Sequence, residues 1–433
     1  MTSLTSALLF GTLVASADTA PDLAAARATD PVAMGWMVGS PPPPDKQIRY
    51  DDGSFYRFPQ SRWSFSHMRE LRPTVAISRG SGPVSKLPNA LRSDLDAVTF
   101  MPMGGKAPMT WADSLIANYT DGIVVLHRGR IVYERYFGAL TSDGRHIAFS
   151  VTKSFFGTLA ATLIAEGKLD PAATVAHYLP ELAHSGFGDA TVAQVLDMTT
   201  ALDFDENYGG SPTFDAYAHA TGFQPRPAGS TNPKSVYAYL TTVAGKGTHG
   251  PEFHYRTPNV DVAGWIIARV TGKSPAVVLS ERIWSRIGAE DDAFMQVEDN
   301  AVPLAGFGLN SRVRDLARFG ELMRLGGKFN GQQIVPAAVV DEIRRGGDRK
   351  AFVFGNYATL PGWSYHDFWW VSHDDHGVYM GRGIHGQAVY VDPKAEMVIA
   401  RFASNPIAGN VGIDPTSLPA YRAIADHLIA HDR

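Results

Sequence analysis

An apolar segment that opens with Ser150 and Lys153 constrains the fold of this chain more than any other feature. From residue 149 to residue 166 the apolar residues have helical spacing, and Gly167 then supplies a stop. Positions i and i+3 share one face of a helix, so the hydroxyl and the amine are expected to meet. A lysine held among Phe149, Phe155 and Phe156 would be partly desolvated, which favours its neutral form and lets it accept a serine proton. The segment therefore predicts a Ser-Lys nucleophile.

A tyrosine further along the chain is the second candidate. Tyr255 lies in the loop 253–259, directly before the apolar helical pattern 260–270. A phenol at such a helix entrance can point into a cleft, and as a phenolate beside a cationic lysine it can act as base and then acid. The alternatives are structural: Tyr255 as an aromatic packed at the helix entrance, and Ser150 and Lys153 as a helix-start serine with a solvated lysine.

The third candidate is the glycine-rich segment Gly381-Arg382-Gly383-Ile384-His385-Gly386-Gln387. It matches G-x-G-x-x-G, but a strand pattern over 388–392 follows where a dinucleotide-binding site requires a helix. Glycines at a sheet edge instead let a substrate carbonyl approach backbone N–H groups closely. This edge suits an oxyanion hole.

Composition narrows the classes of partner and cofactor. The 433 residues are 45% hydrophobic and 19% charged, with 39 basic and 43 acidic side chains, and they contain no cysteine. This is the composition of a globular protein with no basic bias, so nucleic acid is not expected as a partner. Thiol nucleophiles, disulfides and thiolate metal ligands are excluded.

A histidine and aspartate cluster, residues 373–376 with His366 and Asp367, is the one grouping that invites a metal site. Its spacing matches no common zinc motif, so we interpret it as a polar loop and expect neither a metal nor a cofactor.

The order of patterns along the chain predicts its organisation. Strand patterns at 122–127 and 131–137 form an expected hairpin, and further strands are expected at 368–372, 388–392 and 397–402. Between them the patterns are mostly helical, at 192–198, 260–270, 276–287 and 314–325, and a last helix is expected at 420–429. We therefore expect an α/β domain from residues 21–185 and 325–433, interrupted by an all-α domain over 186–324, with the catalytic cleft between them.

The N-terminus, residues 1–20, has features of a signal peptide. Residues 4–17 are apolar and end in Ala15-Ser16-Ala17, a small-residue cleavage pattern, although no Lys or Arg precedes them. These features favour secretion or export to a periplasm, and a cytoplasmic location remains the alternative. Neither this run nor any other uninterrupted apolar stretch reaches the ~18 residues of a membrane span, so no membrane association is expected.

Taken together, these motifs resemble the penicillin-recognising serine hydrolases, which include class C β-lactamases, D-alanyl-D-alanine carboxypeptidases, and related esterases and amidases. Within that family the resemblance is to the subgroup of 6-aminohexanoate-dimer hydrolases, and it covers the chain from about Arg62 to the C-terminus. The segments that carry it are 62–68, 150–153, 195–198, 250–255, 315–318 and 383–387. The resemblance implies a class C β-lactamase-like α/β fold, with an antiparallel sheet flanked by helices and a mostly helical insertion.

The resemblance also assigns roles. Ser150 would be the acylated nucleophile, Lys153 and Tyr255 its proton relay, the backbone N–H groups of Ser150 and Ile384 the oxyanion hole, and Tyr208 a hydrogen-bond partner of the substrate amide. It implies a serine hydrolase of small linear amides or short-chain esters, without cofactor, and a homodimer. The alternatives are a short-chain carboxylesterase and a penicillin-binding or acylated sensor protein.

Two departures from the family pattern bear on the substrate. Lactam-binding members carry Lys-Thr-Gly where this chain has Gly381-Arg382-Gly383, and Tyr-x-Asn where it has Tyr255-Arg256-Thr257. Both disfavour a β-lactamase. The amidases carry an acidic residue in the loop after Tyr208 for a substrate amine, and Asp215 is the candidate for that position.

Overall fold

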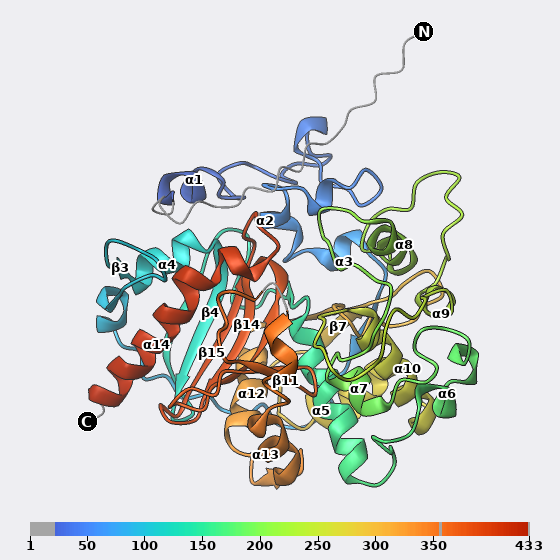
Figure 1. The fold of residues 1–433 in the computed structure, drawn as a ribbon. Coiled ribbons are helices and arrows are strands. Elements are labelled where there is room, and N and C mark those ends of the chain that lie inside the picture. The colour runs from blue at the N-terminus through green and yellow to red at the C-terminus, as the bar shows by residue number, and fades with distance from the viewer. Residues whose placement is uncertain (1–21, 355–356, 432–433) are drawn as a thin grey trace.

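A computed structural model describes residues 22–354 and 357–431 (Figure 1). The predicted signal peptide, residues 1–20, lies outside the described residues. Among the described residues no single helix is long and apolar enough to cross a bilayer, and one sharply bent pair, Pro258–Thr271 with Pro275–Trp284, meets the criterion only by length and composition.

A seven-stranded antiparallel sheet forms the main layer, in the order β11-β12-β13-β14-β15-β4-β5. The C-terminal strand β15 pairs with the early strand β4, with Ile399 opposite Val125. The central strands are buried along almost their whole length because helices cover both faces. The strand bounds are β4 Thr120–His127, β5 Arg130–Tyr136, β11 Ser364–His366, β12 Trp369–Val371, β13 Tyr379–Gly383, β14 Gln387–Asp392 and β15 Met397–Ala403.

Two helices cover the opposite faces of this sheet. On one face α12, Val313–Arg324, contacts β4, β14 and β15. On the other, α14, Asp414–Ala430, packs Tyr421 against Tyr390, with ring centroids 5.1 Å apart. Tyr390 and its neighbour Val389 point to opposite faces of β14, and Val389 lies against α12. The expectation of an antiparallel sheet flanked by helices is confirmed.

Helix α5, Val151–Ala165, lies between the sheet and the helical part of the molecule, and its residues 151–163 are all buried. Close approach between this helix and the sheet explains the one glycine of α5 and the two of β13. A Cβ on Gly157 would come within 1.8 Å of the Asp367 carbonyl oxygen, in the turn between β11 and β12. A Cβ on Gly383 would come within 2.8 Å of the Ala148 carbonyl oxygen. The sheet therefore holds the start of α5 in a fixed position.

The helical part lies on the other side of α5 (Figure 1). Its longest helix, α10, contacts α5, α7 and α11. Its members are α6 Val175–Tyr178, α7 Val192–Leu196, α8 Pro212–Thr221, α9 Val236–Leu240, α10 Pro258–Thr271 and α11 Pro275–Leu279. The helix expected over 276–287 is wrong in one respect: a π-type turn, Ser280–Trp284, follows α11.

The segment 186–324, expected to be all-helical, also contains two strands, β7 Ala293–Gln296 and β8 Leu309–Ser311. They belong to a four-stranded sheet of order β1-β7-β8-β6, with β1 Thr74–Ile77 and β6 His146–Ile147. The sequence did not indicate β7 because its four residues, Ala-Phe-Met-Gln, include no β-branched side chain. The division into two domains with the boundaries given above stays a prediction.

The N-terminal segment wraps over one end of the sheet and reaches the helical part (Figure 1). Its helices are short: α1 Leu23–Ala28, α2 Ser61–Ser64 and α3 Met68–Leu71, with the 3-10 turns Pro44–Lys46 and Ser54–Tyr56. The remaining elements are β2 Thr99–Phe100, β3 Met109–Thr110, α4 Trp111–Ala117, β9 Lys328–Phe329, β10 Gln332–Gln333 and α13 Ala337–Arg345.

Candidate active site

The structure places Ser150 and Lys153 in contact at the start of α5. Ser150 directly precedes the helix, after Phe149, which has a positive φ of 42°. Lys153 Nζ lies 2.8 Å from Ser150 Oγ and donates a second hydrogen bond, of 2.6 Å, to the Gly306 carbonyl oxygen. Lys153 is 1% exposed and Ser150 6%. A serine hydroxyl thus faces a buried amine with a fixed geometry.

Burial lowers the pKa of Lys153 to about 8, against the charges of Glu206 and Asp261, which raise it. Asp261 lies behind the lysine: its carboxylate accepts hydrogen bonds from the Gly306 N–H at 3.2 Å and from the Tyr217 hydroxyl at 2.6 Å. Desolvation therefore brings the pKa of the amine near to ordinary pH, so that its neutral form is accessible, and the two carboxylates limit that effect.

Tyr255, from the loop before α10, lines the same site. Its ring stacks on Trp370 with a centroid distance of 5.6 Å, and Lys153 Nζ lies 5.2 Å from its ring centroid. Burial raises the pKa of Tyr255 well above its usual value, the Glu206 charge adds to this, and a hydrogen bond with Ser150 opposes it. The phenol is thus neutral at rest, and of the two expected bases the lysine amine is the one these surroundings favour.

Ile384 reaches the site through the turn that follows β13. Ile384 and Ser150 line one cavity, and the next residue, His385, has a positive φ of 62°. Sequence reasoning explained the glycines of β13 by the approach of a substrate. In the structure they face α5, because a Cβ on Gly381 would meet Ser154 Oγ at 2.7 Å and one on Gly383 would meet Ala148.

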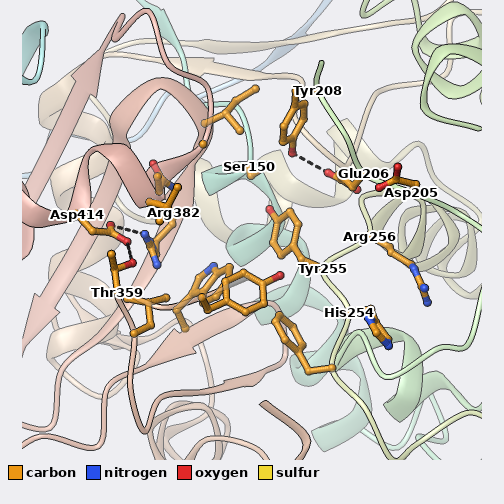
Figure 2. Close-up of a pocket in the computed structure, with 18 of the residues that line it drawn as sticks. Ser150, Asp205, Glu206, Tyr208, His254, Tyr255, Arg256, Thr359, Arg382 and Asp414 are labelled. Carbon is orange, nitrogen blue, oxygen red and sulfur yellow. Dashed lines mark hydrogen bonds and ion pairs between the residues drawn. The ribbon is translucent and has the colours of Figure 1, made fainter. Parts of the chain in front are cut away.

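These groups open on a cavity of about 530 Å³ that is lined by aromatic and polar side chains (Figure 2). Ser150 and Tyr255 lie between two polar groups: Arg382 with Asp414 and Thr359 on one side, and Glu206 with Asp205 and Tyr208 on the other. The aromatic residues of the lining are Phe204, Tyr208, Phe253, Tyr255, Tyr357 and Trp370.

Tyr208 lies at this cavity, where its hydroxyl donates a 2.7 Å hydrogen bond to Glu206 Oε1. Glu206 also accepts hydrogen bonds from the backbone N–H and the hydroxyl of Thr257, at the start of α10. Asp215 is not among the residues that line the cavity; on the side of Tyr208 the acidic residues are Glu206 and Asp205, and Asp414 lies on the other side. Glu206 was not predicted from the sequence. The one feature that could have indicated it is its position two residues before Tyr208.

Arg382 forms a buried ion pair with Asp414, and its guanidinium lies 5.0 Å from the Trp370 ring centroid. Asp414 also accepts a hydrogen bond from Thr359. The one cation in the glycine-rich strand is therefore neutralised by a carboxylate from the start of α14. No sequence pattern indicated Asp414, because it lies 32 residues away from its partner.

The histidine and aspartate residues of the predicted polar loop separate in the structure. His376 pairs with Asp392, and His373 bonds Ser364. His366, Asp367 and Asp197 do come together, with potential ligand atoms within 4.8 Å of one another. His366 Nδ1 lies 2.8 Å from Asp197; burial lowers the pKa of the imidazole, but Asp197 and the other carboxylates outweigh it and raise the pKa to about 9.

The family of this chain follows from its similarity to known proteins. The family model described as Beta-lactamase matches residues 112–411. The chain therefore belongs to the β-lactamase family, and it is a hydrolase with the fold of that family, as its resemblance to penicillin-recognising serine hydrolases implied.

Within the family, one curated relative is the 6-aminohexanoate-dimer hydrolase of Paenarthrobacter ureafaciens, 35% identical over 356 residues, which are 82% of this chain and 88% of the relative. A solved structure from Bacillus anthracis, given the same name provisionally, has a TM-score of 0.81 at 31% identity and covers 89% of this chain and 99% of its own. A family VIII carboxylesterase structure shares the fold alone, with a TM-score of 0.53 at 19% identity over 72% of this chain and 96% of its own.

Proposed function

We propose that this protein cleaves small linear amides or short-chain esters through an acyl-enzyme on Ser150. The observation that carries the proposal is the 2.8 Å contact between Ser150 Oγ and the buried Lys153 amine at the edge of a cavity. A serine is a weak nucleophile unless an adjacent base removes its proton, and this amine has the position and the lowered pKa for that task.

The proton path follows from the surroundings of each group. Neutral Lys153 takes the Ser150 proton as Oγ attacks the substrate carbonyl carbon. Tyr255, whose raised pKa keeps its proton on the phenol, donates that proton to the leaving nitrogen or oxygen as its bond to the carbonyl carbon breaks. The Tyr255 phenolate then takes back a proton from the Lys153 ammonium, which restores the neutral phenol and the neutral amine. Water hydrolyses the acyl-enzyme by the reverse path.

The negative charge that develops on the substrate oxygen must be stabilised by hydrogen-bond donors. The backbone N–H groups of Ser150 and Ile384, residues that border the same cavity, are the proposed oxyanion hole. Donors of this kind stabilise the tetrahedral intermediate more than the substrate, and removal of one costs about 3 kcal/mol.

The cavity walls favour a linear substrate over a β-lactam. Arg382 is paired with Asp414, so it does not offer a free cation to a lactam carboxylate. Tyr208 and Glu206 form a polar pair beside the nucleophile, where Tyr208 can turn its hydroxyl from Glu206 to a substrate amide. The name of the Paenarthrobacter relative supports a linear amide, since 6-aminohexanoate dimer is one. A homodimer remains part of this proposal.

Burst kinetics with a p-nitrophenyl ester test the proposal. Wild-type protein should release one equivalent of p-nitrophenol per active site before steady turnover, and Ser150→Ala should abolish both phases. Ser154→Ala is the matched control, because Ser154 lies one turn further along α5, bonds the Phe368 carbonyl and does not line the cavity. An unchanged burst in Ser150→Ala would refute the proposed nucleophile.

The substrate is decided by a panel of linear amides, short-chain esters and a chromogenic cephalosporin. We expect ester and amide cleavage with negligible hydrolysis of the cephalosporin. Mass spectrometry of protein mixed with a labelled ester separates an enzyme from an acylated sensor: a transient adduct on Ser150 supports the proposal, and a permanent adduct supports a sensor.

A further inference from the structure

Tyr56 lies in the N-terminal segment, outside the matched region 112–411, yet it reaches the back of the proposed oxyanion hole. Its hydroxyl is 2.8 Å from Nε2 of His385, the residue that follows Ile384. The contact joins positions 329 residues apart in the chain. It therefore links the N-terminal segment to the turn that presents one of the two proposed donors.

The direction of this hydrogen bond is fixed by the other side of the imidazole. Nδ1 of His385 lies 2.7 Å from the Asn405 carbonyl oxygen, which can only accept, so Nδ1 carries the hydrogen. Burial lowers the pKa of His385 to about 4, so the ring is neutral and Nε2 is an acceptor. Burial raises the pKa of Tyr56 far above its usual value, so its hydroxyl keeps the proton and donates it to Nε2.

The backbone of His385 is held as well. Its N–H donates to the Ala408 carbonyl, and its own carbonyl accepts from the Asn405 N–H. Both ring nitrogens of His385, and its backbone N–H and carbonyl groups, thus form hydrogen bonds. This matters because His385 has a positive φ of 62°, a conformation that a residue with a side chain keeps only where the surroundings impose it.

The same tyrosine touches the neighbour of the other proposed donor. The rings of Tyr56 and Phe149 meet edge to face, with centroids 6.5 Å apart, and Phe149 lies 5.6 Å from His385. Phe149 precedes Ser150 and also has a positive φ, of 42°. Each proposed N–H donor is therefore adjacent in sequence to a residue of unusual backbone conformation, and Tyr56 contacts both of these residues.

We infer that Tyr56 is a positioning residue for the oxyanion hole: its hydroxyl fixes His385, and through His385 the direction of the Ile384 N–H. The inference rests on the proposed function, since it assigns a task within that mechanism. The chemistry it serves is the tetrahedral, negatively charged intermediate of an amide or ester, and not ground-state binding of the substrate. Its signature is a loss of kcat at constant KM.

Tyr56→Phe tests the inference because it keeps the ring contacts and removes only the hydroxyl. We expect kcat per active site, with sites counted by burst amplitude, to fall about 10-fold with KM unchanged. Affinity for a boronic acid, which forms a tetrahedral adduct with the serine, should weaken by a similar factor. Tyr50→Phe is the matched control: Tyr50 lies in the same segment and donates a 2.9 Å bond to the Gly222 carbonyl, away from the cavity.

A misfolded fraction would lower the burst amplitude and not the rate constant per site, so a structural defect is distinguishable from lost positioning. Wild-type kcat and boronate affinity in Tyr56→Phe would overturn the inference. A readout independent of activity is the ¹⁵N resonance of His385 Nε2, assigned by its loss in His385→Gln. It should shift in Tyr56→Phe, and an unchanged resonance would refute the hydrogen bond. Failure of wild-type protein to form an acyl-enzyme refutes the proposed function instead.

Discussion

The charged and polar groups on the two sides of the cavity differ in their burial and in what holds them in place. On the helix side, Ser150 and Lys153 are buried at the start of α5, and desolvation sets the pKa of the amine. On the loop side, Asp205 is exposed and Glu206 and Tyr208 are partly exposed, and there hydrogen bonds hold the groups in place. Bond-breaking chemistry needs rigid surroundings that exclude water, whereas a loop is sufficient to recognise a substrate.

Removal of the buried amine of Lys153 should lower activity more than any other change. Lys153→Met should lower kcat at least about 10³-fold, because the serine loses its base. The same change should raise stability at pH 7 by roughly 1–3 kcal/mol, because a cation with a depressed pKa no longer has to be buried.

The sign of the stability effect can be checked against pH. The unfolded chain holds the Lys153 proton up to its ordinary pKa of 10.5 and the folded protein only up to about 8, so the stability of the wild type rises between these values. The gain in Lys153→Met should therefore shrink over that window in denaturant titrations. A gain that grows with pH, or a variant with substantial turnover, would contradict the assigned environment.

A second change breaks the contact between the sheet and α5. Gly383→Ala places a Cβ 2.8 Å from the Ala148 carbonyl oxygen, so β13 must move away from the start of the helix. We expect kcat/KM to fall about 10²-fold, since Ile384 follows directly and its N–H is displaced. Gly82→Ala, at a position with no atom within 4 Å of the added carbon, is the control. Equal activities of the two variants would show that the contact is not needed.

A smaller effect is expected on the loop side. Tyr208→Phe keeps the ring against Phe214 and removes the hydroxyl that bonds Glu206. We expect kcat/KM for a linear amide to fall about 5- to 10-fold, the value of one hydrogen bond, and less for an ester that offers no amide N–H. Tyr239→Phe, which loses a bond to the Thr213 carbonyl, is the matched control. Equal losses for ester and amide would argue against contact with the amide.

The smallest change that we expect is a shift in the pH dependence of kcat/KM. Because Lys153 acts as a neutral amine with a pKa of about 8, kcat/KM should rise with pH and level off above that value. The Asp261 charge raises the pKa of Lys153, so Asp261→Asn should lower it and move the rising limb to lower pH. Glu206→Gln should act in the same direction and serves as a second variant. A limb that moves upward would contradict the electrostatic assignment.

Much of the fold could be predicted from local patterns. The apolar spacing after Ser150 indicated α5, and the two β-type segments around Arg128-Gly129-Arg130 indicated the β4–β5 hairpin, which the structure confirms. The short strand β7 and the π-type turn after α11 were missed, since neither is long enough to produce a periodic signal.

Some residues of the candidate site were likewise predicted from the sequence, and others were not. Sequence reasoning selected Ser150, Lys153 and Tyr255, which the structure brings together, but it missed Glu206, Asp261 and Asp414. Asp261 reads as an ordinary polar position on a helix, and only the fold places its carboxylate behind the lysine.

The amino-acid sequence was enough to select the side chains that we propose for the chemistry and to predict that Ser150 and Lys153 meet, because residues three positions apart lie on one face of a helix. The burial of the amine, the carboxylates that oppose its neutral form, and the contact of Tyr56 with His385 became known from the folded chain alone. The physical reason is that desolvation, and contacts between residues hundreds of positions apart, depend on how all the elements pack, and no local pattern records that packing.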